Sequence, residues 1–316
     1  MFSMLGTVCY AQTEPNKTAP TLLDAKLTLR KQKVMVGEPI VVEFTFTNNR
    51  AEEINASAMT GYDNQSFARL SLKTSQGAVL AWETERDQSP EIHMGGVQLT
   101  PLPIGPSKDY SGAIVVPNTV LPKTPGHYVL HIAINLPYRT QRSGERIYKA
   151  ESNLALDVTP GKNQELITIA QQLRKDTARA EHEGVLATRA LLQMPEKIAA
   201  PYWESIAGAP SSSYSPKLQV FVDVLRARRN AFAVTLLARM WDTAGSRENP
   251  LAKYGEYSQP GLKASMAQQA LTFMYPRSGS AVKAQIREIF LFHDKENEAN
   301  ELPESVDKEK RPTFVG

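Results

Sequence analysis

The spacing of apolar residues changes once along this chain, near Pro160-Gly161. Before that point the apolar runs are short, rich in Val, Ile, Thr and Tyr, and separated by Pro or Gly turns, which is typical of strands. After it, apolar residues recur every three or four positions, as they do in helices. The pattern predicts a multi-domain chain, all-β and then all-α, with a leading segment 1–23, a β domain 24–160, a helical domain 161–295 and a tail 296–316.

Seven short strands are expected in the first half, and the second of them shows the pattern most clearly. Val42, Phe44 and Phe46 alternate there with more polar neighbours, so one face of the strand is apolar and the other faces water. Seven such strands favour an antiparallel β-sandwich. The expected strands are 26–31, 40–47, 68–74, 79–84, 110–116, 126–134 and 153–158.

Two turn sequences carry a family resemblance. The segments VGEPIVVEFTFTN, from Val36, and TPGHYVLHI, from Thr124, resemble the B and F strands of immunoglobulin-like domains in bacterial extracytoplasmic proteins. Tyr128 stands where such a domain has its tyrosine corner, whereas Leu130 stands where an antibody domain has its second cysteine. The resemblance covers about residues 24–159; it implies an Ig-like sandwich and carries no function with it.

The second half predicts an array of antiparallel helices joined by short loops. The 3.6-residue period favours helices over 164–180, 184–194, 262–275 and 280–293, and two more within 217–242 that meet near Asn230. The array loosely resembles HEAT-type repeats, but no clean period near forty residues is found, so a compact α-helical bundle and a repeat-like array both stay open. The tail 296–316 is polar and acidic, and it is expected to be disordered.

Composition narrows the possible partners. The net charge is +3, with 18 basic and 12 acidic residues in 161–295 and an acidic excess in the tail. The basic residues form no stripe with interleaved aromatics, so no nucleic-acid partner is expected. No apolar run approaches the eighteen residues of a transmembrane span, so none is expected.

The start of the chain predicts export. Residues 1–12 are apolar and small and contain Cys9-Tyr10-Ala11, which fits a signal-peptidase site before Gln12. The segment is interpreted as a truncated signal peptide, with a buried N-terminal strand as the alternative. Cleavage there leaves a chain without cysteine, compatible with a periplasmic or secreted bacterial protein.

Several patterns that can carry catalysis have simpler explanations. Ser280 and Lys283 match the S-x-x-K of penicillin-recognising enzymes, but no S-D-N or K-T-G follows, and Ser280 is better explained as a helix N-cap. His127 and His131 lie on one strand about 13 Å apart, too far to share one zinc ion. No metal, cofactor or catalytic residue is therefore expected. Carboxylates that suit glycoside hydrolysis gather at Glu83, Glu85, Asp87 and Glu91, where a solvated loop is the simpler interpretation.

Aromatic residues in expected loops of the helical half are the strongest binding candidates. Tyr and Trp rings supply rigid contact area at low entropic cost, and neighbouring Ser and Gly adapt their hydrogen bonds, as in antibody paratopes. Arginines at the end of a helix can also bind a carboxylate or phosphate. The candidate binding residues are Tyr202, Trp203, Tyr214, Tyr254, Tyr257, Arg226 and Arg229.

These observations favour a non-enzymatic extracytoplasmic binding protein. It would recognise a protein or a glycan through the helical-domain loops or the domain junction. The alternative is a cell-envelope hydrolase or an enzyme inhibitor, with Glu83, Glu85 or Arg229 near its site. A structural module whose helical half docks to a membrane complex is a third hypothesis.

Overall fold

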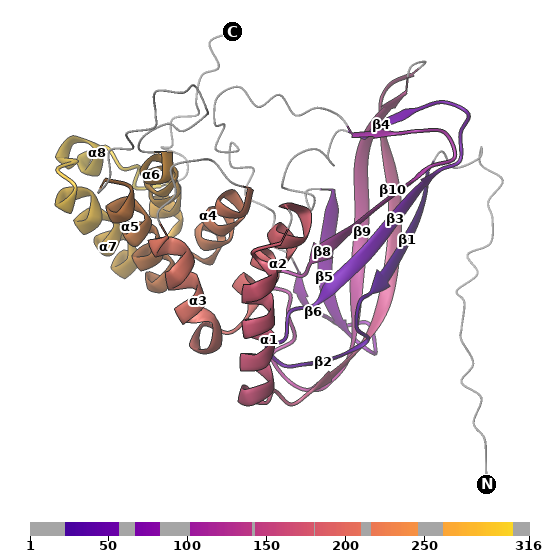
Figure 1. Cartoon of the computed structure of the whole chain (residues 1–316), viewed down its shortest axis with the longest axis horizontal. Helices are drawn as coiled ribbons and strands as arrows, with labels where there is room; N and C mark the ends of the chain where they lie inside the picture. The colour runs from indigo at the N-terminus through magenta and orange to yellow at the C-terminus, as the bar shows by residue number, and fades with distance from the viewer. Residues whose placement is uncertain are drawn as a thin grey trace.

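The computed structural model describes residues 23–56, 67–82, 102–140, 143–179, 181–209, 216–245 and 262–305. Among these residues, strands occur up to Thr159 and helices begin at Asn163. Figure 1 shows the sheets on one side and the helices on the other, with α1 and α2 lying next to the strands. The predicted change from β to α structure near residue 160 is confirmed.

The strands form a small and a large sheet. In the small sheet the order is β1-β3-β8, and both pairings are antiparallel. In the large sheet the order is β2-β10-β9-β4-β7, and β5 also pairs with β9 while β6 pairs with β5. The β2–β10 pairing is parallel, and the other pairings of this sheet are antiparallel. The strands are β1 (Leu23–Leu29), β2 (Lys33–Met35), β3 (Val41–Asn48), β4 (Ile54–Ala56), β5 (Ala68–Thr74), β6 (Val79–Trp82), β7 (Leu102–Ile104), β8 (Asp109–Val115), β9 (Gly126–Thr140) and β10 (Ser143–Thr159).

The two sheets share one apolar core. The alternation predicted for β3 is confirmed, because Val42, Phe44 and Phe46 are buried, at 2% exposure or less. Phe46 meets Tyr148 of the large sheet edge-on, with the ring centroids 6.2 Å apart. Face-to-face contact of this kind is how antiparallel sheets bury their apolar faces.

All seven expected strands are present, but three others were not predicted. β2, β4 and β7 are only three residues long, too short for a two-residue alternation to be recognised. β9 and β10 are also longer than expected and form one long hairpin. At the start of β9 the Tyr128 hydroxyl donates to the carbonyl oxygen of Thr124 at 2.9 Å, the backward hydrogen bond of a tyrosine corner.

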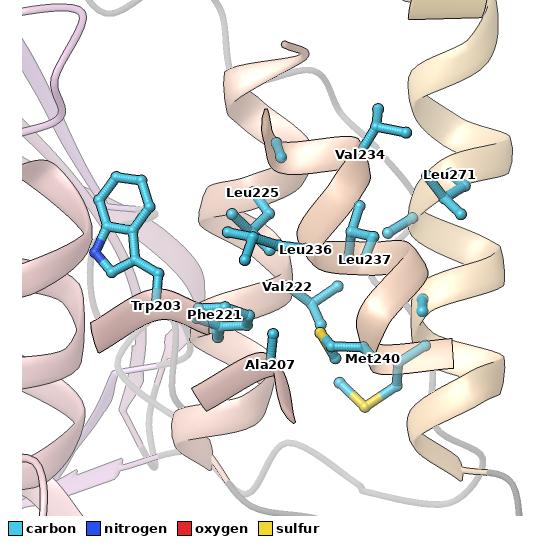
Figure 2. Close-up of a cluster of buried hydrophobic side chains, with 14 of the residues drawn as sticks. Trp203, Ala207, Phe221, Val222, Leu225, Val234, Leu236, Leu237, Met240 and Leu271 are labelled. Atoms are coloured by element: carbon cyan, nitrogen blue, oxygen red, sulfur yellow. The ribbon is translucent and has the colours of Figure 1, made fainter. Parts of the chain in front are cut away.

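The helical half contains eight α-helices among the described residues. Their apolar faces meet in a single core, part of which is shown in Figure 2. The helices are α1 (Asn163–Asp176), α2 (Glu181–Gln193), α3 (Glu196–Gly208), α4 (Pro216–Arg228), α5 (Ala231–Gly245), α6 (Leu262–Met274), α7 (Ser280–Phe292) and α8 (Glu296–Asn300), with a 3-10 turn, η3 (Tyr275–Arg277), between α6 and α7.

The junction between α4 and α5 lies where the sequence predicts it. Arg229 takes a left-handed φ of 51° and ends α4, as a residue after a helix C-terminus commonly does. The Asn230 side chain then accepts a hydrogen bond from the backbone N–H of Ala233 at 2.9 Å and caps α5. At α7, by contrast, Gly279 is the N-cap and Ser280 is the first helical residue, one position away from the predicted cap.

Two segments differ from the expectation. Residues 196–208, which include the expected Tyr202-Trp203 loop, form helix α3 with Pro201 inside it. In the tail, which was expected to be disordered, residues 296–300 form α8, and Ala299 and Leu302 are buried in the helical core. Residues 296–300 thus differ from the expectation, because Ala299 packs on the helical core.

The two halves pack closely at one junction. The Gln193 side-chain oxygen at the end of α2 accepts a hydrogen bond from the backbone N–H of Asn118 at 2.7 Å. Gly37, with φ of +89°, lies so close to Pro195 that a Cβ at this position would be 2.8 Å from the proline Cγ. A glycine here satisfies both the left-handed backbone and the close approach, so the turn before β3 fits against the α2–α3 connection.

Candidate functional site

Tyr202 and Trp203 belong to the helical core rather than to a loop. Trp203 is fully buried, and its Nε1 donates to the carbonyl oxygen of Leu191 at 3.1 Å. Its ring lies 5.7 Å from that of Phe232. Tyr202, one position along α3, is partly buried against the same core. The expectation that Trp203 contacts a partner does not fit this burial, because a fully enclosed ring has no surface to offer.

The remaining tyrosine candidates lie outside the described residues. Tyr214 falls in segment 210–215, between α3 and α4, and Tyr254 and Tyr257 fall in segment 246–261, between α5 and α6. The carboxylates Glu83, Glu85, Asp87 and Glu91 also lie outside the described part of the chain. What the structure does describe is the set of helix ends from which the two tyrosine-containing segments leave.

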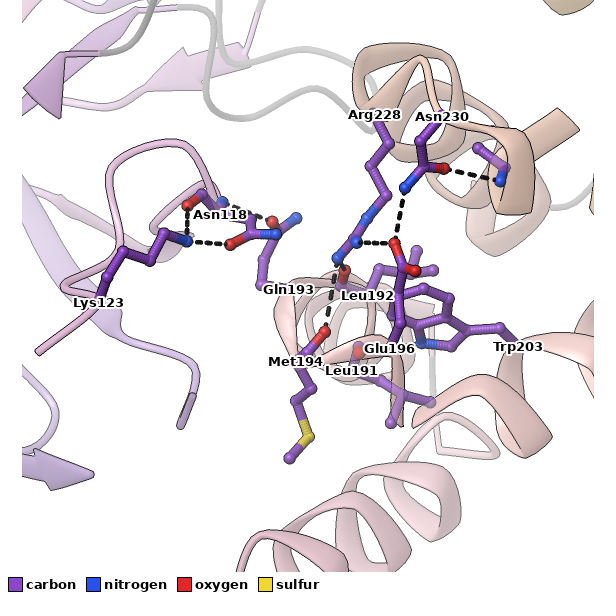
Figure 3. A network of polar contacts seen from close by, with 11 residues as sticks. Asn118, Lys123, Leu191, Leu192, Gln193, Met194, Glu196, Trp203, Arg228 and Asn230 are labelled. Atoms are coloured by element: carbon purple, nitrogen blue, oxygen red, sulfur yellow. Dashed lines mark hydrogen bonds and ion pairs between the residues drawn. The ribbon is translucent and has the colours of Figure 1, made fainter. Parts of the chain in front are cut away.

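Arg228, which belongs to the densest arginine group of the sequence but is not among the candidate binding residues, holds the α2–α3 connection (Figure 3). Its guanidinium donates to the carbonyl oxygens of Leu192 and Met194 at the end of α2. It also forms an ion pair with Glu196, at 3.1 Å, and covers the Trp203 ring at 4.5 Å from the centroid. A cation at the carbonyl end of a helix is favoured by the helix dipole, so Arg228 closes α2 and joins α4 to α3.

Burial and charge around Arg228 shift two pKa values. Burial lowers the pKa of Arg228, and the Glu196 carboxylate raises it in compensation. The Asn230 side chain also donates to Glu196, at 2.7 Å, so this carboxylate has two partners from the α4–α5 connection. In the facing β-domain loop, burial lowers the pKa of Lys123, and the positive Arg228 adds to that shift. The network is a structural clamp, because each of these charged groups is held by a partner within the chain.

Arg226 lies at the contact between α4 and α6, and Arg229 lies at the turn between α4 and α5. Arg226 pairs with Asp223 at 3.3 Å and lies over the Phe273 ring, 4.8 Å from its centroid. Arg277 covers the same ring at 3.7 Å. Arg229 turns the chain between α4 and α5. The predicted binding residues that the structure describes are therefore split between the α3 core and the α4–α6 contact.

A buried lysine joins the helix ends next to the tyrosine-containing segments. Lys263, the second residue of α6, is 2% exposed. Its ammonium donates to the carbonyl oxygens of Ala207 and Ala209 at 2.5 and 2.7 Å and to the Thr243 hydroxyl at 3.1 Å. We call these four residues the Lys263 cage. A cation in the first turn of α6 is unfavourable for that helix, but here it neutralises the carbonyl end of α3.

Burial lowers the pKa of Lys263 to about 8 because it removes water from the ammonium, and the positive charge of Arg239 adds to the shift. The three oxygen atoms that accept from Lys263 are neutral groups, which only partly replace the lost hydration. Glu204 of α3 lies 3.9 Å from Arg239 and offsets the charge of the second cation. The lysine is therefore charged at neutral pH at a cost to the folded state.

This cost predicts an unusual pH dependence of stability. Lys263 has a lower pKa in the folded chain, about 8, than the ordinary 10.5. Below pH 8 both states hold the proton and the cost is fully present; between pH 8 and 10.5 the unfolded state binds more protons, so stability rises with pH. Relative to Lys263→Met, the wild type should gain on the order of 2–3 kcal/mol across that window. Urea unfolding of both proteins at pH 7, 8, 9 and 10 measures the difference, and a difference that does not change with pH would refute the shift.

The side chains of the S-x-x-K and histidine patterns have other partners in the described structure. Lys283 contacts Glu304 rather than Ser280, so the S-x-x-K pattern has no assembled catalytic pair. His127 contacts Asp157, and His131 contacts Asn153, each across the exposed β9–β10 hairpin. No group of three or more metal-ligating side chains occurs in the parts of the chain that the structure describes.

A hollow of about 450 Å³ lies between β2 and α1, at the domain junction. Its apolar lining includes Val34, Met35 and Ile169. Its charged lining is largely paired, because Lys31 contacts Glu38 at 2.6 Å and Lys162 contacts Glu165 at 2.8 Å. Because most of its charged side chains are paired with each other or with a neighbour, the hollow does not indicate a reaction.

Comparison with known proteins adds little. No protein-family model and no curated protein matches the chain. A PapD-like domain of human CEP192 is similar over 50% of this chain and all of its own length, with 11% identity and a TM-score of 0.25. A CARDB domain from Pyrococcus furiosus is similar over 46% of this chain and all of its own length, with 10% identity and a TM-score of 0.23. Scores this low carry no argument about function.

Among the described helices, none is long and apolar enough to cross a membrane.

Proposed function

We propose that this chain is a non-enzymatic, extracytoplasmic binding protein that recognises a protein or a glycan through segments 210–215 and 246–261 of its helical domain. The observation that carries the proposal is the Lys263 cage. Segment 210–215 leaves α3 directly after Ala209, whose carbonyl oxygen accepts from Lys263. Segment 246–261 begins after α5 ends, two residues beyond Thr243, and its 16 residues end just before Leu262, the neighbour of Lys263. One side chain thus joins three of the four helix ends that bound the two segments.

Joining the ends of both segments through the Lys263 cage suits recognition for an energetic reason. Ordering a segment on binding costs conformational entropy, and fixing its ends in advance lowers that cost. The two segments contain the sequences Ser-Ser-Ser-Tyr-Ser and Lys-Tyr-Gly-Glu-Tyr-Ser, a composition in which rigid aromatic rings are combined with adaptable small polar residues. The Lys263 cage and the amino-acid composition are two independent observations that support segments 210–215 and 246–261 as the recognition surface.

The β half supports an extracytoplasmic setting in this proposal. We infer that the two sheets form an immunoglobulin-like sandwich, since they share one core and Tyr128 makes the hydrogen bond of a tyrosine corner. The proposed export rests on the apolar and small residues up to Ala11, which fit a signal-peptidase site before Gln12. The domain junction is a weaker candidate surface, because Gln193 and Pro195 are already engaged with the β half there.

Replacing Tyr254 and Tyr257 together with alanine is expected to weaken partner binding about thirtyfold or more, since binding hot spots contribute at least about 2 kcal/mol. The measurement compares how much material the immobilised wild type and variant retain from a dilution series of cell-envelope extract. Phe292→Ala is the matched control: it removes an aromatic ring that is 77% exposed on α7, far along the chain from both segments. Equal retention by all three proteins would remove the two tyrosines from the proposal.

A further inference from the structure

The C-terminal segment places a carboxylate in a prepared basic site on the helical domain. Glu304 Oε1 accepts a hydrogen bond from the Tyr275 hydroxyl at 3.0 Å and lies 3.5 Å from Arg287 Nη2. Lys283 Nζ donates to the backbone carbonyl oxygen of Glu304 at 2.7 Å and lies 3.4 Å from Oε2. We call Tyr275, Lys283 and Arg287 the carboxylate site.

The carboxylate site belongs to η3 and α7, not to the segment that fills it. With residues 302–304 in place, Tyr275 is 2% exposed, and its hydroxyl is held as a donor to the carboxylate. Lys283 and Arg287 both lie over the Tyr275 ring, at 5.1 and 5.8 Å from its centroid. They are one turn apart on α7, so the helix itself sets their spacing. Two cations and a buried hydroxyl are thus arranged around one anion position.

A second anchor lies two residues earlier. Leu302 is 5% exposed and belongs to the helical core, and Pro303 between the two anchors restricts the backbone. The segment therefore makes contact through an apolar side chain, a proline and a carboxylate, in that order. Residues 301–305, the part of the segment after α8 that the structure describes, form no helix or strand, and 57% of the Glu304 side chain is exposed.

Charge favours an acidic ligand at this site. The helical half carries 18 basic and 12 acidic residues, whereas the segment from residue 296 onward carries an acidic excess. Hydrogen bonding from Tyr275 lowers the pKa of Glu304, with Lys283 and Arg287 acting in the same direction. Electrostatic attraction of this kind speeds the encounter of oppositely charged surfaces and selects against basic ligands.

We propose that the carboxylate site, together with the apolar seat of Leu302, is a docking site for an acidic Leu-Pro-Glu-type peptide of a partner protein, and that residues 302–304 occupy it within the same chain. A short segment held by two side chains and one backbone carbonyl can be replaced by an equivalent segment from outside. Its covalent attachment gives it an effective concentration in the millimolar range, so the site is largely closed until a tighter peptide competes. The proposal does not use Tyr254 or Tyr257, so its failure and that of the proposed function are separate outcomes.

The test uses a fluorescent peptide with the sequence of residues 296–305 and the full chain. In Glu304→Lys the chain's own segment is repelled by Lys283 and Arg287, so the peptide should bind at least tenfold more tightly than to the wild type, and more weakly as salt is raised. Adding Arg287→Gln to Glu304→Lys should reverse most of this gain in affinity. Replacing the peptide's glutamate at the position of Glu304 with glutamine should do the same. Fluorescence anisotropy gives the dissociation constants, and circular dichroism confirms that each variant is folded.

Two results would overturn the proposal. One is equal affinity of the peptide for the wild type and for a folded Glu304→Lys variant. The other is no measurable binding to that variant or to Leu302→Ser/Glu304→Lys, in which both anchors of the resident segment are removed. Either result would mean that residues 302–304 only complete the fold.

Discussion

Replacing Trp203 with alanine is expected to lower the free energy of unfolding by about 3–5 kcal/mol, the usual cost of truncating a large buried aromatic side chain. The Trp203 ring is fully buried, packs near Phe232, and lies under the guanidinium of Arg228. Its removal also leaves the Leu191 carbonyl without the indole donor. Urea unfolding followed by circular dichroism measures the loss.

The control for Trp203→Ala is Phe292→Ala, whose ring is 77% exposed and whose loss should change stability by no more than about 0.5 kcal/mol. If both variants lost the same small amount, Trp203 would behave as a surface residue. That result would favour the aromatic loop predicted from the sequence over the helix found at residues 196–208.

Replacing Arg228 with methionine is expected to cost about 2–4 kcal/mol. The change leaves the carbonyl groups of Leu192 and Met194 without this donor, and each buried polar group that loses its partner costs about 1–3 kcal/mol. The ion pair with Glu196 contributes less than a buried pair would, because the Glu196 side chain is 38% exposed. Urea unfolding gives the stability of the variant.

Arg30→Met is the matched control for Arg228→Met. Arg30 pairs with Glu43 at a similar distance, 2.9 Å, but both side chains are about half exposed, so its loss should cost less than about 1 kcal/mol. Equal losses in the two variants would mean that the Arg228 clamp contributes only as much as a surface ion pair. Because Arg228 covers Trp203, the double variant should lose less than the sum of the two single losses.

Much of the fold could be predicted because its elements are long enough to show a period. β5 begins and ends where the alternation predicted, and the α4–α5 junction lies at Asn230 as expected. The three-residue strands show no period, and their pairing depends on neighbours distant in sequence. Helix α3 was missed because the aromatic pair Tyr202-Trp203 suggested a loop. The four-residue spacing of Ala199, Trp203 and Ala207 was the signal that could have identified it.

The contacts that organise the helical half could not be predicted from local sequence. Arg226 and Arg229 were singled out from the arginine group, but Arg228 carries the clamp, and its partners lie 32–36 positions away. Lys263 meets Ala207 across 56 positions. In the tail, Leu302 and Glu304 are two anchors among polar residues, too few to raise an apolar or helical signal above the acidic background.

The measurement that tests the central claim most directly is affinity capture from a cell-envelope extract at moderate salt, with the immobilised full chain and identification of the bound protein and glycan. A recognition surface on the helical domain predicts one species held in stoichiometric amount by the wild type and by Phe292→Ala, and lost with the tyrosine pair 254 and 257. Retention of nothing above background by the folded wild type would contradict the claim that this chain is a binding protein of the cell envelope.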